Sequence, residues 1–165
     1  MAAVKPGAKA PKFSIPTTAG EFRTGGKPGE NLVIYFYPRD NTPGCTLEGS
    51  DFRDLAPAFR RARTRILGIS TDTLESHRRF KDKVKFPFEL GSDEDHSVAG
   101  LFGVWKEKNM YGRKMMGIER STFLIDAGGA LRREWRKVRV AGHAAEGAAQ
   151  ADPEVLRHGL MVHHR

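Results

Sequence analysis

A chain of 165 residues can bury about two-thirds of its unfolded surface, which is enough for one hydrophobic core without disulfide support. Its single cysteine argues against a secreted disulfide framework, and no apolar stretch approaches the length of a membrane span. The net charge of +8 comes from dispersed basic clusters, including 77–79 and 106–114, which favours a solvated surface over a specific nucleic-acid site. We therefore expect one domain over residues 1–165 that is cytoplasmic and monomeric and binds neither membranes nor specific nucleic acid.

The first half of the chain alternates predicted strands with predicted helices. An extended segment rich in proline and glycine, residues 6–29, leads into an apolar strand over 32–37. A helix is predicted to begin near Cys45, with apolar residues at helical spacing. Pro57 lies inside this helix and predicts a kink or an early end, because proline removes one backbone hydrogen bond.

The next predicted elements continue the same alternation. A second strand is predicted over 65–70, followed by a helix that Thr73 caps and that reaches about Lys83. Residues 86–88 are expected to form a short extended link, and 96–102 a short helix. Parallel strands joined by helices indicate an α/β protein with a central mixed β-sheet flanked by helices.

A hairpin and a helix are predicted to close the chain. The hairpin strands cover 122–126 and 131–140 and are joined by a glycine-rich turn. The last helix is expected to restart at Pro153, so that residues 144–151 form an insertion before it. No cysteine or carboxylate is spaced to complete a metal site with the histidines of this segment, so we interpret them as surface residues; they are His158, His163 and His164.

The surroundings of Cys45 favour a reactive thiolate. Cys45 follows the predicted strand 32–37 and a turn that ends in Pro43 and Gly44, so it lies where a helix begins. Free N–H groups and the positive end of the helix dipole both stabilise an anion at this place. A lone cysteine is more often a small buried hydrophobe, but Cys45 is flanked by a turn and by polar residues.

Two separate stretches of the chain resemble the peroxiredoxins. Residues 35–48 resemble the active-site loop of that family, and the run 40–46 with 51–54 is similar more narrowly to its bacterioferritin-comigratory (peroxiredoxin Q) subfamily. The stretches 103–112 and 120–126 match the same subfamily. The resemblance implies a thioredoxin-like fold with an extended or hairpin segment at its N-terminus.

The resemblance implies a catalytic role for each residue of the motif. Pro38, Thr42 and Cys45 match the family's Pro-x-x-x-Thr-x-x-Cys pattern, and Arg120 matches its catalytic arginine. Cys45 would attack the peroxide and become a sulfenic acid, while Arg120 would stabilise the thiolate and the leaving oxygen. Thr42 would hydrogen-bond the peroxide, Pro38 would keep water from the sulfur, and Glu48 would orient the arginine. Taken singly, the four residues other than Cys45 are more typical of turns, of the surface and of the first turn of a helix, and only their joint placement favours a catalytic site.

One departure from the subfamily concerns the second cysteine. Many members carry a resolving cysteine five residues after the first, where this chain has Ser50, and others carry it at the position of residues 80–82. With Cys45 alone, no intramolecular disulfide can form. Either the chain is a natural one-cysteine peroxidase, or Ser50 is an engineered replacement that holds the reduced state.

The sequence therefore predicts a thiol-dependent peroxidase that reduces hydrogen peroxide and organic hydroperoxides through a sulfenic acid at Cys45. An external thiol would recycle the enzyme, with thioredoxin, glutaredoxin or glutathione as the reductant, and no cofactor or metal is implied. Two alternatives remain: a peroxide sensor or thiol-relay protein that uses the same cysteine without efficient turnover, and a basic interaction module with a vestigial site.

Overall fold

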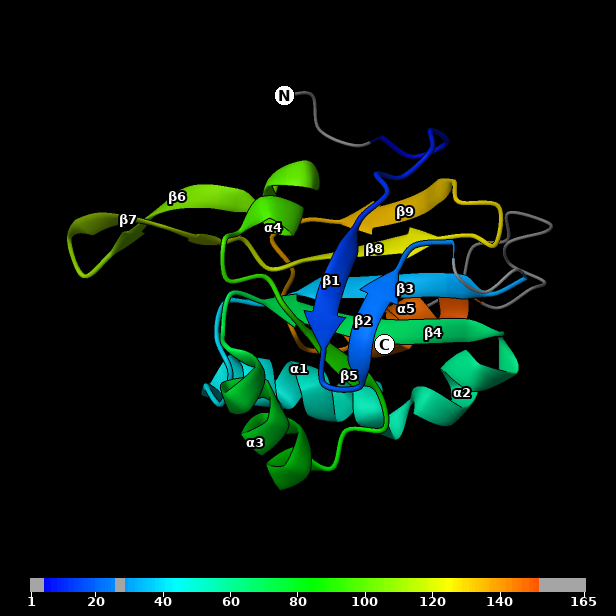
Figure 1. The fold of residues 1–165 in the computed structure, drawn as a ribbon, viewed down its shortest axis with the longest axis horizontal. Coiled ribbons are helices and arrows are strands. Elements are labelled where there is room, and N and C mark those ends of the chain that lie inside the picture. Colours follow the sequence, from blue (N-terminus) through cyan, green and yellow to red (C-terminus); the bar gives the residue numbers. More distant parts are fainter. Residues whose placement is uncertain (1–4, 26–28, 152–165) are drawn as a thin grey trace.

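The structure, a computed structural model, describes residues 5–25 and 29–151 and is built around a seven-stranded mixed sheet (Figure 1). The strands of this sheet are β1 (Ser14–Thr17), β2 (Gly20–Arg23), β3 (Asn31–Phe36), β4 (Thr64–Ser70), β5 (Glu89–Ser92), β8 (Ser121–Ile125) and β9 (Leu131–Trp135). Their order is β2-β1-β5-β4-β3-β8-β9. The pairs of β4 with β3 and β5 are parallel and the other pairs antiparallel, which confirms the predicted mixed α/β sheet.

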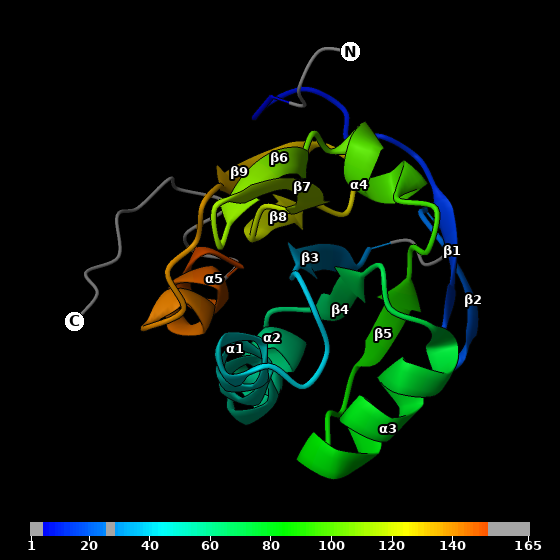
Figure 2. The ribbon, with the colours of Figure 1, turned by 90° about the vertical axis from the view of Figure 1, so that its left-hand side faces the viewer.

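The sheet separates two apolar cores, as the inner strand β3 shows. Val33 and Tyr35 face one core, Ile34 and Phe36 face the other, and none of these side chains is more than 1% exposed. The first core is covered by α1 (Pro43–Asp54), α2 (Ala56–Arg61), α3 (Leu74–Val84) and α5 (His143–Ala151), whereas α4 (Ser97–Leu101) and the β1–β2 hairpin cover the second (Figure 2). Burial on both faces explains why 32–37 is an uninterrupted apolar run.

Two predictions about helix ends are confirmed. The helix that follows β3 breaks before Pro57: α1 ends at Asp54, and α2 begins at Ala56 with the proline in its first turn. Thr73 caps α3, because its hydroxyl accepts a hydrogen bond from the backbone N–H of Ser76. No helix among the described residues is long and apolar enough to cross a membrane.

The strand predicted over 131–140 is too long. β9 ends at Trp135, because the guanidinium of Arg136 turns back and donates to two backbone carbonyls that follow α4. The chain then leaves the sheet, and the N–H of Val138 donates to the carbonyl of Arg120 at 2.9 Å. The segment predicted as a strand end therefore braces the backbone of Arg120.

The insertion predicted over 144–151 is also wrong, because these residues form the last described helix itself. They are rich in alanine, the strongest helix former, and α5 runs over His143–Ala151. Ala144 and Ala151 are buried in the core beneath α1 and α2. The restart predicted at Pro153 lies outside the described residues, as do the histidines at 158, 163 and 164.

A hairpin that we did not predict extends from the body of the fold. β6 (Trp105–Met110) and β7 (Arg113–Ile118) form a separate two-stranded sheet, seen at the left of Figure 1. Tyr111 and Gly112 make its turn with positive φ angles of 52° and 76°, as in a type I′ turn. Charged residues interrupt the apolar alternation by which strands are predicted, and the short β5 was missed as well.

Candidate active site

Cys45 lies in the first turn of α1, at the end of the helix where free backbone N–H groups gather. The chain reaches it from β3 through a turn at residues 38–42, and Pro43 starts the helix. The Cys45 side chain is only 1% exposed. The sulfur is therefore shielded from bulk water while it lies in the positive potential of the helix end.

Arg120 joins the sulfur of Cys45 to the carboxylate of Glu48. Its Nη2 donates to the sulfur at 3.3 Å, and its Nη1 donates to Oε1 of Glu48 at 2.5 Å. Glu48 and Cys45 are three residues apart on α1, so their side chains share the helix face toward the start of β8, where Arg120 lies. A planar guanidinium offers several donors in fixed directions and can hold both partners together.

The charges of this trio depend on burial and on one another. Burial raises the pKa of Glu48 to about 7, although the neighbouring Arg120 acts to lower it. Burial alone would lower the pKa of Arg120, but Glu48 and Cys45 outweigh it and raise that pKa. Arg120 therefore keeps its positive charge beside the sulfur, with 17% of its side chain exposed.

Two glycines make room for cations around the site. A Cβ atom on Gly44 would lie 3.2 Å from Nη2 of Arg120, and one on Gly117 would lie 3.3 Å from Cδ of Lys108. Lys108 is half-buried. Burial lowers the pKa of Lys108, the positive charge of Arg120 lowers it further, and Cys45 acts in the opposite direction. The Lys108 side chain thus passes over Gly117 of β7 and is a second cation near the sulfur. The sequence showed only that Lys108 belongs to the basic cluster 106–114.

Thr42 and Pro38 flank the turn that leads to α1. Thr42 occupies the N-cap position, but its hydroxyl donates to the carbonyl of Arg39 at 3.0 Å and does not cap the helix. Pro38 is half-buried two residues after the end of β3, and Ser50 is half-buried within α1. The structure therefore brings Arg120 into contact with both Glu48 and Cys45. Thr42 and Pro38 are close to Cys45 in the sequence, on the turn that leads to it.

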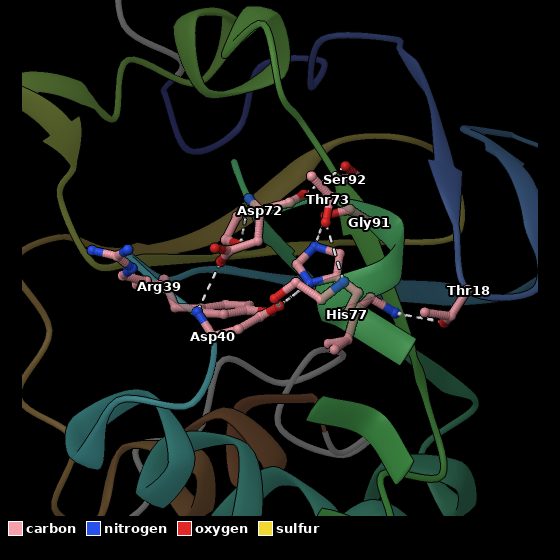
Figure 3. A network of polar contacts seen from close by, with 12 residues as sticks. Thr18, Arg39, Asp40, Asp72, Thr73, His77, Gly91 and Ser92 are labelled. Atoms are coloured by element: carbon pink, nitrogen blue, oxygen red, sulfur yellow. Dashed lines mark hydrogen bonds and ion pairs between the residues drawn. The ribbon is translucent and has the colours of Figure 1, made fainter. Parts of the chain in front are cut away.

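A buried polar network holds this turn against α3 (Figure 3). Asp40, between Pro38 and Thr42, accepts hydrogen bonds from the hydroxyls of Tyr37 at 2.6 Å and Ser76 at 2.8 Å. Its other neighbour is Nδ1 of His77 at 2.7 Å. The turn before Cys45 is therefore anchored to a helix that is distant in sequence.

His77 corrects the surface interpretation of the cluster 77–79, because its side chain is 0% exposed. Its Nε2 lies 2.8 Å from the carbonyl oxygen of Gly91, which can only accept, so Nε2 carries a hydrogen. Its Nδ1 lies 2.7 Å from a carboxylate oxygen of Asp40, within hydrogen-bond distance. Oxygens of Asp40 and Asp72 and a nitrogen of His77 lie within 4.8 Å of one another, but all are already hydrogen-bonded within the protein, so we interpret the cluster as structural.

Comparisons with known proteins show the family to which the chain belongs. The sequence pattern of the AhpC/TSA family matches residues 6–134, so the chain belongs to that family. It is 48% identical over 141 residues to the peroxiredoxin Bcp of Bacillus subtilis, covering 85% of this chain and 90% of that protein. It is 45% identical over 144 residues to the putative peroxiredoxin bcp of Coxiella burnetii, covering 87% and 95%.

A solved structure extends the likeness to the fold. The bacterioferritin comigratory protein of Xanthomonas campestris matches with a TM-score of 0.80 and 46% identity, covering 84% of this chain and 89% of that chain. Within the family, the chain is thus a bacterioferritin-comigratory (peroxiredoxin Q) peroxiredoxin with a thioredoxin-like fold. Its single Cys45 leaves it without a resolving cysteine.

Proposed function

We propose that this chain is a thiol-dependent peroxidase that reduces hydrogen peroxide and organic hydroperoxides at Cys45. The observation that carries the proposal is the contact of Arg120 with both the sulfur and Glu48 at the start of α1. The structure of the Xanthomonas campestris relative comes from work on its alkyl peroxide reduction activity, which supports organic hydroperoxides as substrates.

The first half of the reaction oxidises the sulfur. The Cys45 thiolate attacks the terminal oxygen of the peroxide, a sulfur–oxygen bond forms and the oxygen–oxygen bond breaks. The leaving oxygen takes a proton and departs as water or alcohol. Arg120 stabilises the negative charge on the sulfur before the step and on the leaving oxygen during it, and Glu48 keeps the guanidinium oriented.

Pro38 and Thr42 have supporting roles in this proposal. Pro38 shields the sulfur from water on the side of the turn. The Thr42 hydroxyl donates a hydrogen bond to the bound peroxide, for which it exchanges its partner in the free protein, the carbonyl of Arg39. The network around Asp40 holds both residues in position.

The second half of the reaction needs an external thiol. A sulfenic acid at Cys45 has no second cysteine in the chain with which to condense. We propose thioredoxin, glutaredoxin or glutathione as the reductant, and a single-domain monomer over residues 1–165 that works in the cytoplasm. The single cysteine supports a reducing compartment.

Replacing Cys45 tests the proposal directly. Cys45→Ser should abolish peroxide consumption with dithiothreitol as reductant, because an alcohol cannot replace the thiolate, and circular dichroism should show an unchanged fold. The matched control Ser50→Ala should keep the parent activity. Residual activity of Cys45→Ser above about one per cent would assign the chemistry to another group. A wild-type protein that consumes one equivalent of peroxide and then stops would instead be a sensor.

A further inference from the structure

We infer that the β6–β7 hairpin is the docking surface for the protein that reduces Cys45, and that this partner is an acidic protein with two thiols. The inference rests on the proposed peroxidase function, which creates the need for an external reductant. It concerns a different part of the chain from the groups that react with peroxide, so the two can be tested separately.

The hairpin is held firmly at its base and is free at its tip. Ile118 is buried in the second core, and the Trp105 ring stacks on His96 with 4.3 Å between the ring centroids. Beyond these residues the ribbon extends away from the sheet, at the end of the molecule where α1 begins (Figures 1 and 2). A partner bound to the β6–β7 hairpin, which we call the arm, would therefore lie beside the start of α1, where Cys45 is located.

The exposed apolar side chains of the described residues gather at this end. Met115 and Met116 on β7 are 54% and 52% exposed, and Tyr111 at the turn is 98% exposed. Leu47, two residues beyond Cys45 on α1, is 52% exposed. A two-stranded ribbon gains little stability by itself, and exposed methionines adapt readily to a binding partner. This concentration beside one catalytic centre indicates an interaction surface.

The charge of the arm selects the kind of partner. The arm carries four basic residues against the single carboxylate of Glu107. The strand register places Lys106 and Lys108 on the same face as Met115, and Arg113 follows on that face near the turn. A second copy of the chain would bring the same positive arm and a net charge of +8, so repulsion disfavours it. An acidic protein fits both the charge and the methionine surface.

The chemistry consumes two thiols, and a partner that carries both completes the reaction in a single encounter. One partner thiolate attacks the Cys45 sulfur, the sulfur–oxygen bond breaks, and the oxygen leaves as water after taking a proton. The second partner thiol then attacks the partner's own sulfur, which closes the partner's disulfide and releases the Cys45 thiolate. Since Cys45 is buried, the first turn of α1 must open for this attack, and the Thr42 side chain gives that turn no capping bond.

Charge reversal on the arm tests the inference with an acidic thioredoxin as the probe. In the variant Lys106→Glu/Arg113→Glu, kcat/KM for thioredoxin should fall about tenfold or more, because electrostatic complementarity sets the association rate. The matched control is Arg60→Glu/Arg61→Glu on α2, two exposed residues at the opposite end of the molecule, which changes the net charge equally. Turnover of this control with thioredoxin should stay within about twofold of the parent.

Two further measurements separate docking from chemistry. The rate at which one equivalent of hydrogen peroxide oxidises Cys45, and turnover with the small neutral dithiol dithiothreitol, should be unchanged in both variants. Met115→Gln, which alters the apolar part of the surface without changing charge, should raise KM for thioredoxin and leave turnover with dithiothreitol intact.

Three results would overturn the inference. The first is a loss with thioredoxin that is no larger in the arm variant than in the α2 control. The second is an equal loss with dithiothreitol, which would place the defect in the active site. The third is a wild-type dimer in sedimentation that the arm variant dissociates, which would make a second copy the occupant. A wild-type Cys45 that peroxide fails to oxidise would refute the peroxidase proposal, independently of the surface.

Discussion

Arg120 is held from three sides, and this explains why a single residue can organise the site. Glu48 fixes one guanidinium nitrogen, Gly44 leaves space for the other beside Cys45, and Val138 donates to the Arg120 carbonyl. The side chain therefore reaches the sulfur in a preset orientation, which is the condition for effective electrostatic stabilisation of a transition state.

Arg120→Lys should lower the second-order rate of Cys45 oxidation by hydrogen peroxide by roughly ten- to a thousandfold. Lysine keeps the charge but cannot contact Glu48 and the sulfur together with a rigid fork. Stopped-flow kinetics under single-turnover conditions measure this rate, and Arg61→Lys on the exposed part of α2 serves as the control. An unchanged rate would remove Arg120 from the reacting groups.

Gly44→Ala should separate stability from activity. Alanine is favoured over glycine in a helix by roughly 0.5–1 kcal/mol, so urea unfolding should show no loss of stability. Its Cβ would lie 3.2 Å from Nη2 of Arg120, however, and would push the guanidinium away from the sulfur. We expect an approximately two- to tenfold slower reaction with peroxide, since small misplacements of a catalytic group are costly. A variant as fast as the parent would show that this close approach is unimportant.

Among the elements, α1 carries the reactive cysteine and also the position of the missing one. Ser50 is half-buried on the same helix as Cys45, five residues further on. Side chains with this spacing point in different directions on a wound helix, so a bond between them requires the helix to unwind locally.

Ser50→Cys should convert the chain into a two-cysteine peroxidase. With one equivalent of peroxide, the parent should gain one oxygen in intact mass, and excess peroxide should drive it to an inactive sulfinic acid. The variant should instead lose two hydrogens as the disulfide forms and should resist overoxidation, with Ser50→Ala as the control. A variant that consumes peroxide at Cys45 yet never forms the disulfide would show that α1 does not open.

α3 contributes to the site through the buried pair of His77 and Asp40. His77→Leu leaves the Asp40 carboxylate with only the hydroxyls of Tyr37 and Ser76, and Asp40→Asn weakens the partner of Nδ1 of His77, so each should lower the free energy of unfolding by about 1–3 kcal/mol. Urea denaturation measures this loss. In the double variant the losses should be clearly less than additive, because both changes remove the same contact between Asp40 and His77. Additive losses would show that the two groups do not act as a pair.

At the scale of the whole molecule, stability at low pH depends on a buried histidine in α5, the last described helix. His143, at the start of α5, is buried, and its Nε2 lies 2.8 Å from the hydroxyl of Thr122. Burial lowers the pKa of His143 to about 4, from 6.5 in the unfolded chain. Between pH 4 and pH 6.5, His143 therefore binds a proton in the unfolded state but not in the folded state.

The sign of the effect follows from this difference. The contribution of His143 to stability is complete above pH 6.5 and is lost as the pH falls toward 4, at up to about 1.4 kcal/mol per pH unit. His143→Gln, which keeps an amide to bond Thr122, should show a shallower fall in stability over this range. Thermal unfolding from pH 7 to pH 4 makes the comparison, and parallel curves for the two proteins would contradict it.

The overall organisation followed from the sequence because its signals are local. The apolar run of β3, the proline that separates α1 from α2 and the threonine that caps α3 each act on neighbouring residues. The motif around Cys45 and its resemblance to the peroxiredoxins indicated the family and the fold, which the comparisons confirm.

Local signals failed where a segment's structure depends on distant partners. β9 ends early because the Arg136 side chain reaches carbonyls beyond α4, and the charged β6–β7 ribbon exists only as a pair of strands. His77 appeared to be a surface residue because two arginines follow it. Its burial is decided by Asp40 and Gly91, which belong to other elements.

The sequence by itself determined the reactive group, its place at a helix start and the need for an external thiol, because the count and spacing of residues settle these properties. The resemblance already paired Arg120 with Cys45, but only the tertiary structure decided what else surrounds the site: Lys108 across Gly117, and the turn before Cys45 bound to α3. The reason is physical. Hydrogen bonds and Coulomb interactions act over a few ångströms in space, and only the packing of the sheet and its helices brings residues so far apart in the chain to that distance.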